Sequence, residues 1–323
     1  MALDIDLSGR VAVVTGGTRG VGAGIARALL AAGAEVVACA RRPPERPVTA
    51  ADGRTAAYEP VDVRDPDAVA ACFDRVRARH GRLDILVNNA GGTPYRLLDD
   101  SSPRQAARVV ELNLVAPLTA SLAARAVMAR QPAGGSIIMI GSVSGTRPSP
   151  GSAAYGAAKA GLENLARTMA VEWAPHIRVN TLVVGMVHTE LSHLHYGGEA
   201  GLAAVGRTVP LGRLATPDEI GELCAFLAGD RCAYVSGASL AVHGGGERPA
   251  FLEAAGQPAS PEAAGQLAFP EAAGRPPGAP APHPSAPPSP PAPSTPLSAT
   301  PSPSPAAGTG TAATVDPEGS DDR

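Results

Sequence analysis

Tyr155 and Lys159 stand four residues apart in the run SAAYGAAKAGLENLARTMAVEW, and only glycine and alanine lie between them. A helix places positions i and i+4 on one face, so the phenol hydroxyl and the ammonium would point into the same cleft. Phenol has a pKa of about 10, roughly three units too high for efficient proton exchange at neutral pH. At about 4 Å and an effective dielectric near 20, the lysine charge would contribute about 4 kcal/mol, enough to lower that pKa by two or three units. The pair predicts an acid–base site; the alternative is a half-buried core tyrosine beside a solvated lysine.

A glycine-rich turn, TGGTRGVG at residues 15–22, follows the first apolar run and opens an alanine-rich helical stretch. Gly16, Gly20 and Gly22 allow a tight turn and a close backbone approach, so free N–H groups at the helix N-terminus can face a pyrophosphate. The turn alone is weak evidence, but its place between a strand and a helix is typical of dinucleotide binding.

The residues after the second predicted strand indicate which dinucleotide the protein would bind. A carboxylate there would bind an adenosine ribose and repel a 2′-phosphate. This chain instead has Ala40, Arg41 and Arg42, and Arg19 lies in the glycine turn. Converging guanidinium groups favour NADP(H) over NAD(H) through charge-assisted bonds. The alternative is a basic surface turn that merely follows the strand.

Short β-branched runs alternate with longer helical stretches up to about residue 246, a pattern typical of a parallel sheet with helices on both faces. Nearly continuous apolar runs such as VAVV and SIIMI suit strands that are buried on both faces. We expect seven strands, at residues 10–15, 35–40, 56–63, 83–90, 136–142, 178–184 and 239–244. We expect helices near residues 20–33, 66–80, 102–130, 153–174 and 217–229.

The composition changes after Gly246, where 19 of the 33 prolines lie. Three nine-residue units start at Glu253, Glu262 and Glu271 and read as a low-complexity expansion. We therefore predict one domain over residues 1–246 and a disordered, Pro/Ala/Ser-rich tail over 247–323. The alternative function for the tail is a ligand for a proline-recognition module.

Charge, the N-terminal residues and the cysteines give no sign of a nucleic-acid-binding, membrane or secreted protein. A net charge of −3 gives no indication of nucleic-acid or membrane binding. The N-terminus, MALDIDLSGR, lacks the basic residues of a signal peptide, and we find no apolar run of about 18 residues. The four cysteines lack C-x-x-C spacing and are expected to be buried, reduced thiols. These features predict a cytoplasmic protein.

Taken together, residues 8–246 resemble a classical short-chain dehydrogenase/reductase, and in their C-terminal segment its 3-oxoacyl thioester reductases. TGGTRGVG matches the TGxxxGxG cofactor turn, NNAG at 88–91 the fourth-strand motif, and YGAAK at 155–159 the active-site YxxxK. Asn113 in ELNLVAP, Ser142 in IMIGSVSG and Asp62 in PVDVRD fit further family positions. The resemblance implies an α/β, doubly wound Rossmann fold with a seven-stranded parallel sheet.

The resemblance also implies an enzyme that interconverts a ketone and a secondary alcohol. Tyr155 would be the general acid or base, Lys159 would lower its pKa and bind the nicotinamide ribose, Ser142 would hold the substrate oxygen, and Asn113 would position a water in a proton relay. The residues expected to bind NADP(H) are Gly16, Thr18, Arg19, Gly20, Gly22, Arg41, Asp62, Val63, Asn89, Ala90, Gly91, Tyr155, Lys159 and Thr189.

Two positions depart from the family pattern: Val184 precedes Gly185 where many members have proline, and His243 stands where aspartate is more usual. Residues 187–210 would form the substrate lid, with 93–96 and 146–151 as other pocket walls. Three lid histidines, His188, His193 and His195, suggest a metal site, but no cysteine or acidic set completes a tetrahedral shell, and we expect no metal.

Substrate identity depends on lid side chains that the fold does not fix. A 3-oxoacyl thioester is our first hypothesis, followed by a steroid, polyketide or sugar substrate. A different class of hypothesis is an inactive NADP(H)-binding sensor or scaffold, against which the intact Asn113, Ser142, Tyr155 and Lys159 argue. By resemblance we expect a homo-oligomer, a dimer or tetramer, assembled through the helices at 102–130 and 153–174.

Overall fold

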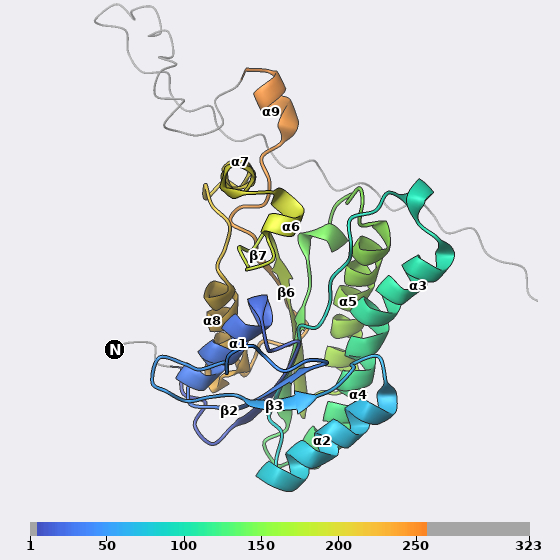
Figure 1. Cartoon of the computed structure of the whole chain (residues 1–323). Helices are drawn as coiled ribbons and strands as arrows, with labels where there is room; N and C mark the ends of the chain where they lie inside the picture. Colours follow the sequence, from blue (N-terminus) through green and yellow to red (C-terminus); the bar gives the residue numbers. More distant parts are fainter. Residues whose placement is uncertain (1–4, 257–323) are drawn as a thin grey trace, which may run out of the picture. The chain divides into compact units, whose positions relative to one another are not determined.

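The computed structural model describes residues 5–256, whose strands form one parallel sheet of seven strands (Figure 1). The spatial order is β3-β2-β1-β4-β5-β6-β7. The chain leaves β1 toward β2 and β3, then returns to β4 on the other side of β1, so a crevice opens beyond the ends of β1 and β4. The predicted seven-stranded Rossmann fold is confirmed. The strands are β1 Val11–Thr15, β2 Glu35–Ala40, β3 Ala57–Pro60, β4 Ile85–Asn88, β5 Gly135–Ile140, β6 Ile177–Val184 and β7 Ser239–Val242.

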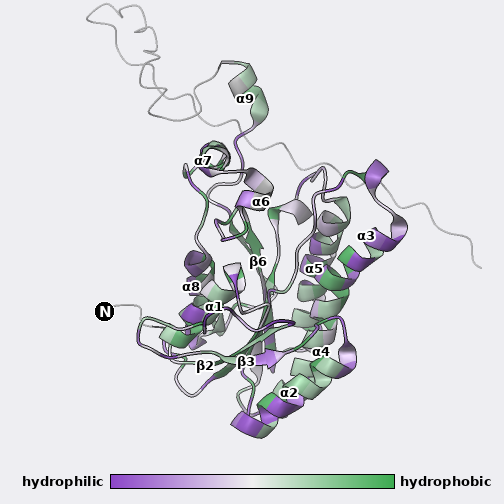
Figure 2. Ribbon diagram, viewed as in Figure 1, coloured by the Kyte–Doolittle hydropathy of each residue, from purple (hydrophilic) through white to green (hydrophobic). Residues whose placement is uncertain are grey.

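Helices cover both faces of the sheet because alternate strand residues point to opposite sides. In β1, Val11 and Val13 belong to the apolar core under α2, α4 and α5, whereas Ala12 and Val14 belong to the core under α1 and α8. Figure 2 shows β6 in green, whereas α2 and α8 also carry purple, hydrophilic residues. The covering helices are α1 Gly20–Ala31 and α8 Pro217–Ala228 on one face, and α2 Pro66–His80, α4 Ala116–Met128 and α5 Ala153–Glu172 on the other.

The single helix predicted over residues 102–130 is interrupted. Helix α3 spans Pro103–Val110, a π-helical turn spans Glu111–Val115, and α4 follows. Asn113 lies inside this wide turn, fully buried, and its side chain bonds to the backbone of Gly92 and of Val109. Such turns often mark functional positions. The pattern of apolar residues could not show the interruption, because it depends on a contact with a distant loop.

The stretch Pro103–Met128 is apolar on average, although charged and polar residues such as Glu111, Asn113 and Arg125 interrupt it. Its 26 residues, with a mean hydropathy of 1.2 in the most apolar window, are long and apolar enough to cross a membrane by length and composition. Here the same stretch forms part of a helical layer in which α3 contacts α5 and α4 contacts α2. Only 28% of that window is buried, so much of an apolar helix face remains exposed within residues 5–256.

Two short helices stand over the C-terminal ends of the strands: α6 His193–Tyr196 and α7 Glu199–Thr208 (Figure 1). A third, α9 Ala250–Ala254, follows β7 and lies within the segment predicted as a tail. Residues 257–323, which hold most of that segment and two of its three repeat units, lie outside the described residues. The domain boundary at residue 246 and the disordered tail therefore stay predictions.

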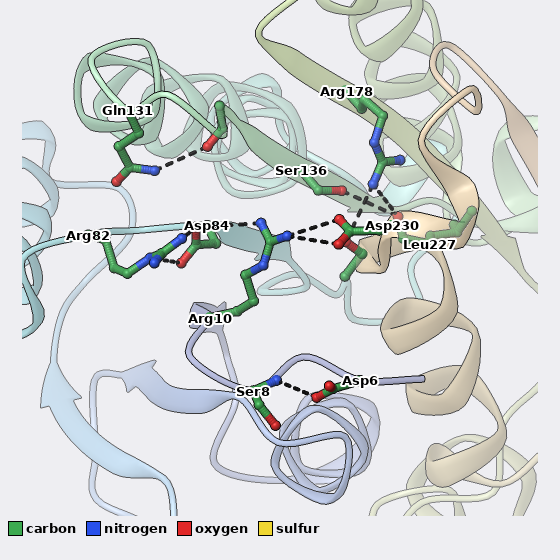
Figure 3. Close-up of polar contacts among 12 residues, drawn as sticks. Asp6, Ser8, Arg10, Arg82, Asp84, Gln131, Ser136, Arg178, Leu227 and Asp230 are labelled. Atoms are coloured by element: carbon green, nitrogen blue, oxygen red, sulfur yellow. Dashed lines mark hydrogen bonds and ion pairs between the residues drawn. The ribbon is translucent and has the colours of Figure 1, made fainter. Parts of the chain in front are cut away.

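A charged network joins the opposite, N-terminal ends of the strands (Figure 3). The Asp84 side chain is 1% exposed, accepts a 2.9 Å hydrogen bond from the Val11 amide and pairs with Arg82 at 2.7 Å. Arg10 lies between Asp84 and Asp230, and its Nη2 is 2.9 Å from the Asp230 carboxylate. The network ties the starts of β1 and β4 to the turn after α8, far from the ends where a dinucleotide would bind.

Candidate active site

One cleft of about 1210 Å³ collects the predicted site residues. It runs along the C-terminal ends of the strands, from the glycine turn to Tyr155. All fourteen residues predicted to bind the cofactor line it, and so does Ser142. Asn113 is the exception among the predicted site residues, because it is buried behind the wall of the cleft.

At one end of this cleft, the turn between β1 and α1 has no room for a side chain at Gly22. A Cβ atom on Gly22 would lie 2.1 Å from the carbonyl oxygen of Gly16, and Gly16 itself has a φ of +65°. The Asn89 amide holds the turn by donating to the carbonyls of Thr15 and Gly16. Arg19, the N-cap of α1, provides no side-chain cap for the helix. A narrow backbone cradle at a helix N-terminus fits the pyrophosphate of a dinucleotide.

Basic side chains gather where the adenosine end of a dinucleotide would lie. Arg19, Arg41 and Arg42 line this part of the cleft and are exposed. Arg64 also lines it and pairs with Asp62 at 2.6 Å. This hydrogen-bonded contact with Arg64 lowers the pKa of Asp62 to about 2. Asp62 is therefore ionised at neutral pH, and the surrounding arginines give the site a surplus of positive charge.

Tyr155 and Lys159 lie at the other end of the cleft. Burial raises the pKa of the Tyr155 phenol, the Ser142 hydroxyl partly offsets this, and Tyr196 adds to the rise. Lys159 is 3% exposed, and its ammonium lies 5.5 Å from the Tyr155 ring centroid and donates a 2.7 Å hydrogen bond to the Ile140 carbonyl. Burial lowers the pKa of Lys159 to about 8.

The pKa of Tyr155 is raised, whereas the expectation was that Lys159 lowers it. The two side chains do share a helix face, as the spacing predicted. However, the ammonium hydrogen-bonds to the Ile140 carbonyl, and burial is the largest influence on the pKa of Tyr155 and on that of Lys159. A pattern of i and i+4 residues gives proximity, but it does not give the degree of burial, which decides the sign of the shift.

Asn113 approaches Lys159 across a glycine. A Cβ atom on Gly91 would lie 2.6 Å from the Asn113 side-chain oxygen and 3.5 Å from the Lys159 nitrogen. The Asn113 oxygen accepts from the Gly92 amide, and its nitrogen donates to the carbonyls of Gly92 and Val109. The side chain thus fixes the loop after β4 against the π turn. Its role in a water relay stays a prediction.

Comparisons with known proteins show which family this chain belongs to. Residues 16–247 match the family model described as "Enoyl-(Acyl carrier protein) reductase". The chain belongs to the short-chain dehydrogenase/reductase family. It is similar to the 3-oxoacyl-[acyl-carrier-protein] reductase FabG of Escherichia coli (strain K12), at 37% identity over 75% of this chain and 98% of that protein. The cis-4-hydroxycyclohexanecarboxylate dehydrogenase of Sinomonas cyclohexanicum is 40% identical over 73% of this chain and 96% of its own length.

Among solved structures, the ligand-free aldohexose dehydrogenase AldT of Thermoplasma acidophilum superposes with a TM-score of 0.69. The two chains are 28% identical, and the match covers 75% of this chain and 95% of that one. This short-chain dehydrogenase/reductase is therefore an oxidoreductase of a family that binds NAD(P)(H).

The two departures from the family pattern are neighbours in this short-chain dehydrogenase/reductase. The Gly185 amide donates to the carbonyl of Val242, and a Cβ atom on Gly185 would lie 2.7 Å from that of His243. His243 therefore packs against the loop that follows Val184. Its Nδ1 atom is buried and has no hydrogen-bond partner among the described residues.

The predicted pocket walls also meet. The Arg96 amide donates to the Gly151 carbonyl, and the Tyr95 ring covers Gly151 so closely that a Cβ atom there would clash with it. Among the lid histidines, His188 and His193 are exposed. Within residues 5–256 no group of three or more histidine, cysteine or acidic side chains could hold a metal ion.

Sequence reasoning missed three residues of the site: Arg64, Tyr196 and Glu190. Arg64 follows Asp62 by two positions in PVDVRD, so the spacing of opposite charges could have revealed it. Tyr196 affects the pKa of Tyr155 from the lid, and Glu190 contacts the glycine turn across 170 residues of chain. No local pattern marks these last two contacts.

Proposed function

We propose that this oxidoreductase uses NADP(H) to interconvert a ketone and a secondary alcohol. The observation that carries the proposal is the single cleft that has a glycine cradle at one end and Tyr155, Ser142 and Lys159 at the other. The cradle suits a pyrophosphate, and the tyrosine end provides a hydroxyl donor beside a second hydroxyl and a buried ammonium.

In this mechanism the four side chains have different tasks. The bound nicotinamide would supply or accept the hydride. Tyr155 gives its hydroxyl proton to the carbonyl oxygen during reduction, and takes it back during oxidation. Ser142 donates to the same oxygen as negative charge develops on it. Lys159 stabilises the transient phenolate electrostatically, and Asn113 holds the loop after β4 in place while serving the proton relay.

The preference for NADP(H) rests on charge. The end of β2 carries Ala40 and Arg41 rather than a carboxylate, and Arg19 and Arg42 line the same part of the cleft. Guanidinium groups would bind a 2′-phosphate with charge-assisted hydrogen bonds. Asp62 is ionised but paired with Arg64, so it adds little repulsion there.

A 3-oxoacyl thioester is the substrate that we favour. The similarity to a 3-oxoacyl-[acyl-carrier-protein] reductase covers almost all of that relative's length. Cyclic hydroxy acids and aldohexoses are the substrates named for two other similar proteins, and they are the second candidates. An inactive cofactor-binding sensor remains the alternative of a different class.

We also propose a homo-oligomer, a dimer or tetramer, that covers the exposed apolar face of α4 and the preceding turn. Val115 is 47% exposed and Leu122 is 52% exposed there. Burial of such side chains against a second copy would be favourable. In symmetric dimers the same surface patch of each copy commonly forms the interface. A cytoplasmic location, expected from the sequence, stays a prediction.

The test is the oxidation of NADPH, and separately of NADH, with a 3-oxoacyl thioester, a cyclic oxo acid and an aldohexose derivative. Tyr155→Phe should lower kcat by about 10²–10⁴-fold while cofactor binding is retained. Tyr234→Phe makes the same chemical change at a fully exposed position and should have no effect. Cofactor binding without turnover by the unmodified protein, on every substrate, would favour the inactive sensor.

A further inference from the structure

The lid reaches into the phosphate end of the cleft. The Glu190 carboxylate accepts a 3.0 Å hydrogen bond from the backbone amide of Gly20, the first residue of α1. Thr189 packs on the same spot, because a Cβ atom on Gly20 would lie 3.6 Å from its methyl group. Gly20, Thr189 and Glu190 all line the cleft. The carboxylate therefore lies at the cradle that fits a pyrophosphate.

The turn that carries Glu190 is held in place from within. The Thr189 amide donates to the Ser192 hydroxyl at 2.8 Å, and this hydroxyl donates to the Val187 carbonyl. Ser192 is 3% exposed. Because the turn is anchored, the position of Glu190 follows from packing of the segment around it rather than from the side chain alone.

Helix α1 has no anionic group of its own at this end. Its N-cap, Arg19, contributes no side-chain acceptor, and its first turn contains no acidic residue. A helix N-terminus favours negative charge because its free N–H groups and its dipole both point outward. Glu190 provides that charge from 170 positions further along the chain.

We propose that Glu190 occupies the pyrophosphate subsite as an internal competitor of the cofactor, so that dinucleotide binding must displace it. This inference rests on the proposed dinucleotide-binding function. A carboxylate and a phosphate cannot both accept from the Gly20 amide at close range, because both are anions. The free energy of the Glu190 contact is therefore subtracted from the affinity for the cofactor.

The test measures the affinity of the full chain for NADPH by calorimetry, without any turnover. Glu190→Gln removes the charge and Glu190→Ala removes the contact, and each should bind NADPH about tenfold more tightly, the value of one hydrogen bond to a charged group. Glu199→Gln is the matched control, since Glu199 is an exposed lid carboxylate at the start of α7. Its affinity should equal that of the unmodified protein.

Hydrogen exchange gives a second readout. In the absence of cofactor, amides of residues 187–192 should exchange faster in Glu190→Gln than in Glu199→Gln. If the unmodified protein binds NADPH but both Glu190 variants bind it equally well or more weakly, the inference about Glu190 is overturned and the proposed function is not affected. If no protein in the set binds NADPH or NADH, the proposed function fails and the inference fails with it.

Discussion

Lys159 places its ammonium 5.5 Å from the centre of the Tyr155 ring, and the same ammonium donates to the carbonyl of Ile140. The amine is thus charged, enclosed and close to the aromatic face at once. Burial lowers its pKa from 10.5 to about 8. The enclosed charge costs stability in the folded state, and this cost is the basis of the first prediction.

Lys159→Met should stabilise the fold at pH 7 by about 2 kcal/mol, after allowance for the lost hydrogen bond. Below about pH 8 the amine is charged in both states, so the unmodified protein bears the full cost of burying it. Between pH 8 and 10.5 the folded state loses its proton first, so stability rises with pH. Urea unfolding of both proteins from pH 7 to 10 should show the difference shrinking. A difference that stays constant over this range would contradict the prediction.

Arg41→Ala should raise the Kd for NADPH by about 10- to 100-fold, the value of a lost charge-assisted contact, and leave the Kd for NADH unchanged. Arg41 is exposed and lines the cleft directly after β2. Arg54→Ala is the control, because Arg54 lies outside the cleft and pairs with Asp52. Titration of each variant with NADPH and with NADH measures the two Kd values. An equal loss for NADPH and NADH would count against a contact with the 2′-phosphate.

Gly22→Ala should open the turn between β1 and α1. The new Cβ would lie 2.1 Å from the Gly16 carbonyl oxygen, which is backbone and cannot move aside cheaply. We expect a loss of about 1–3 kcal/mol in stability and weaker dinucleotide binding. Gly198→Ala is the matched change, since no heavy atom lies within 4 Å and its φ is −72°. Thermal unfolding with and without NADPH would show both effects. If the two variants had equal melting temperatures and equal affinities for NADPH, the predicted clash at Gly22 would be refuted.

Asp84→Ala should lower the free energy of unfolding by about 1–3 kcal/mol, because it leaves the buried Val11 amide without its charged acceptor, whereas the half-exposed Arg82 can be solvated. Asp52→Ala removes a carboxylate from a surface pair and should have a far smaller effect. Urea denaturation measures both. Comparable losses for the two variants would show that the network adds no more than a surface ion pair.

Local patterns predicted much of this structure. The helix expected near residues 217–229 is α8, and the preceding Thr216 caps it by accepting from the Glu219 amide. The four cysteines, expected to be buried, are buried and free. Cleft residues close to strand ends were also predictable, because parallel strands bring their C-terminal ends to one edge.

Contacts between distant segments were not predictable. The π turn at Asn113 depends on Gly92, and the position of Glu190 depends on a turn anchored by Ser192. The direction of the pKa shift at Tyr155 required its burial, which no spacing of residues gives. A single sequence contains no signal for such pairs.

The network around Asp84 has a consequence for variation in this protein. It secures the starts of β1 and β4, at the end of the sheet opposite the cleft, whereas the loops at residues 93–96 and 146–150 are exposed or half-buried. Random mutagenesis confined to residues 93–96 and 146–150 should therefore yield mostly folded progeny, and new substrate preferences could arise there without a prior gain in stability.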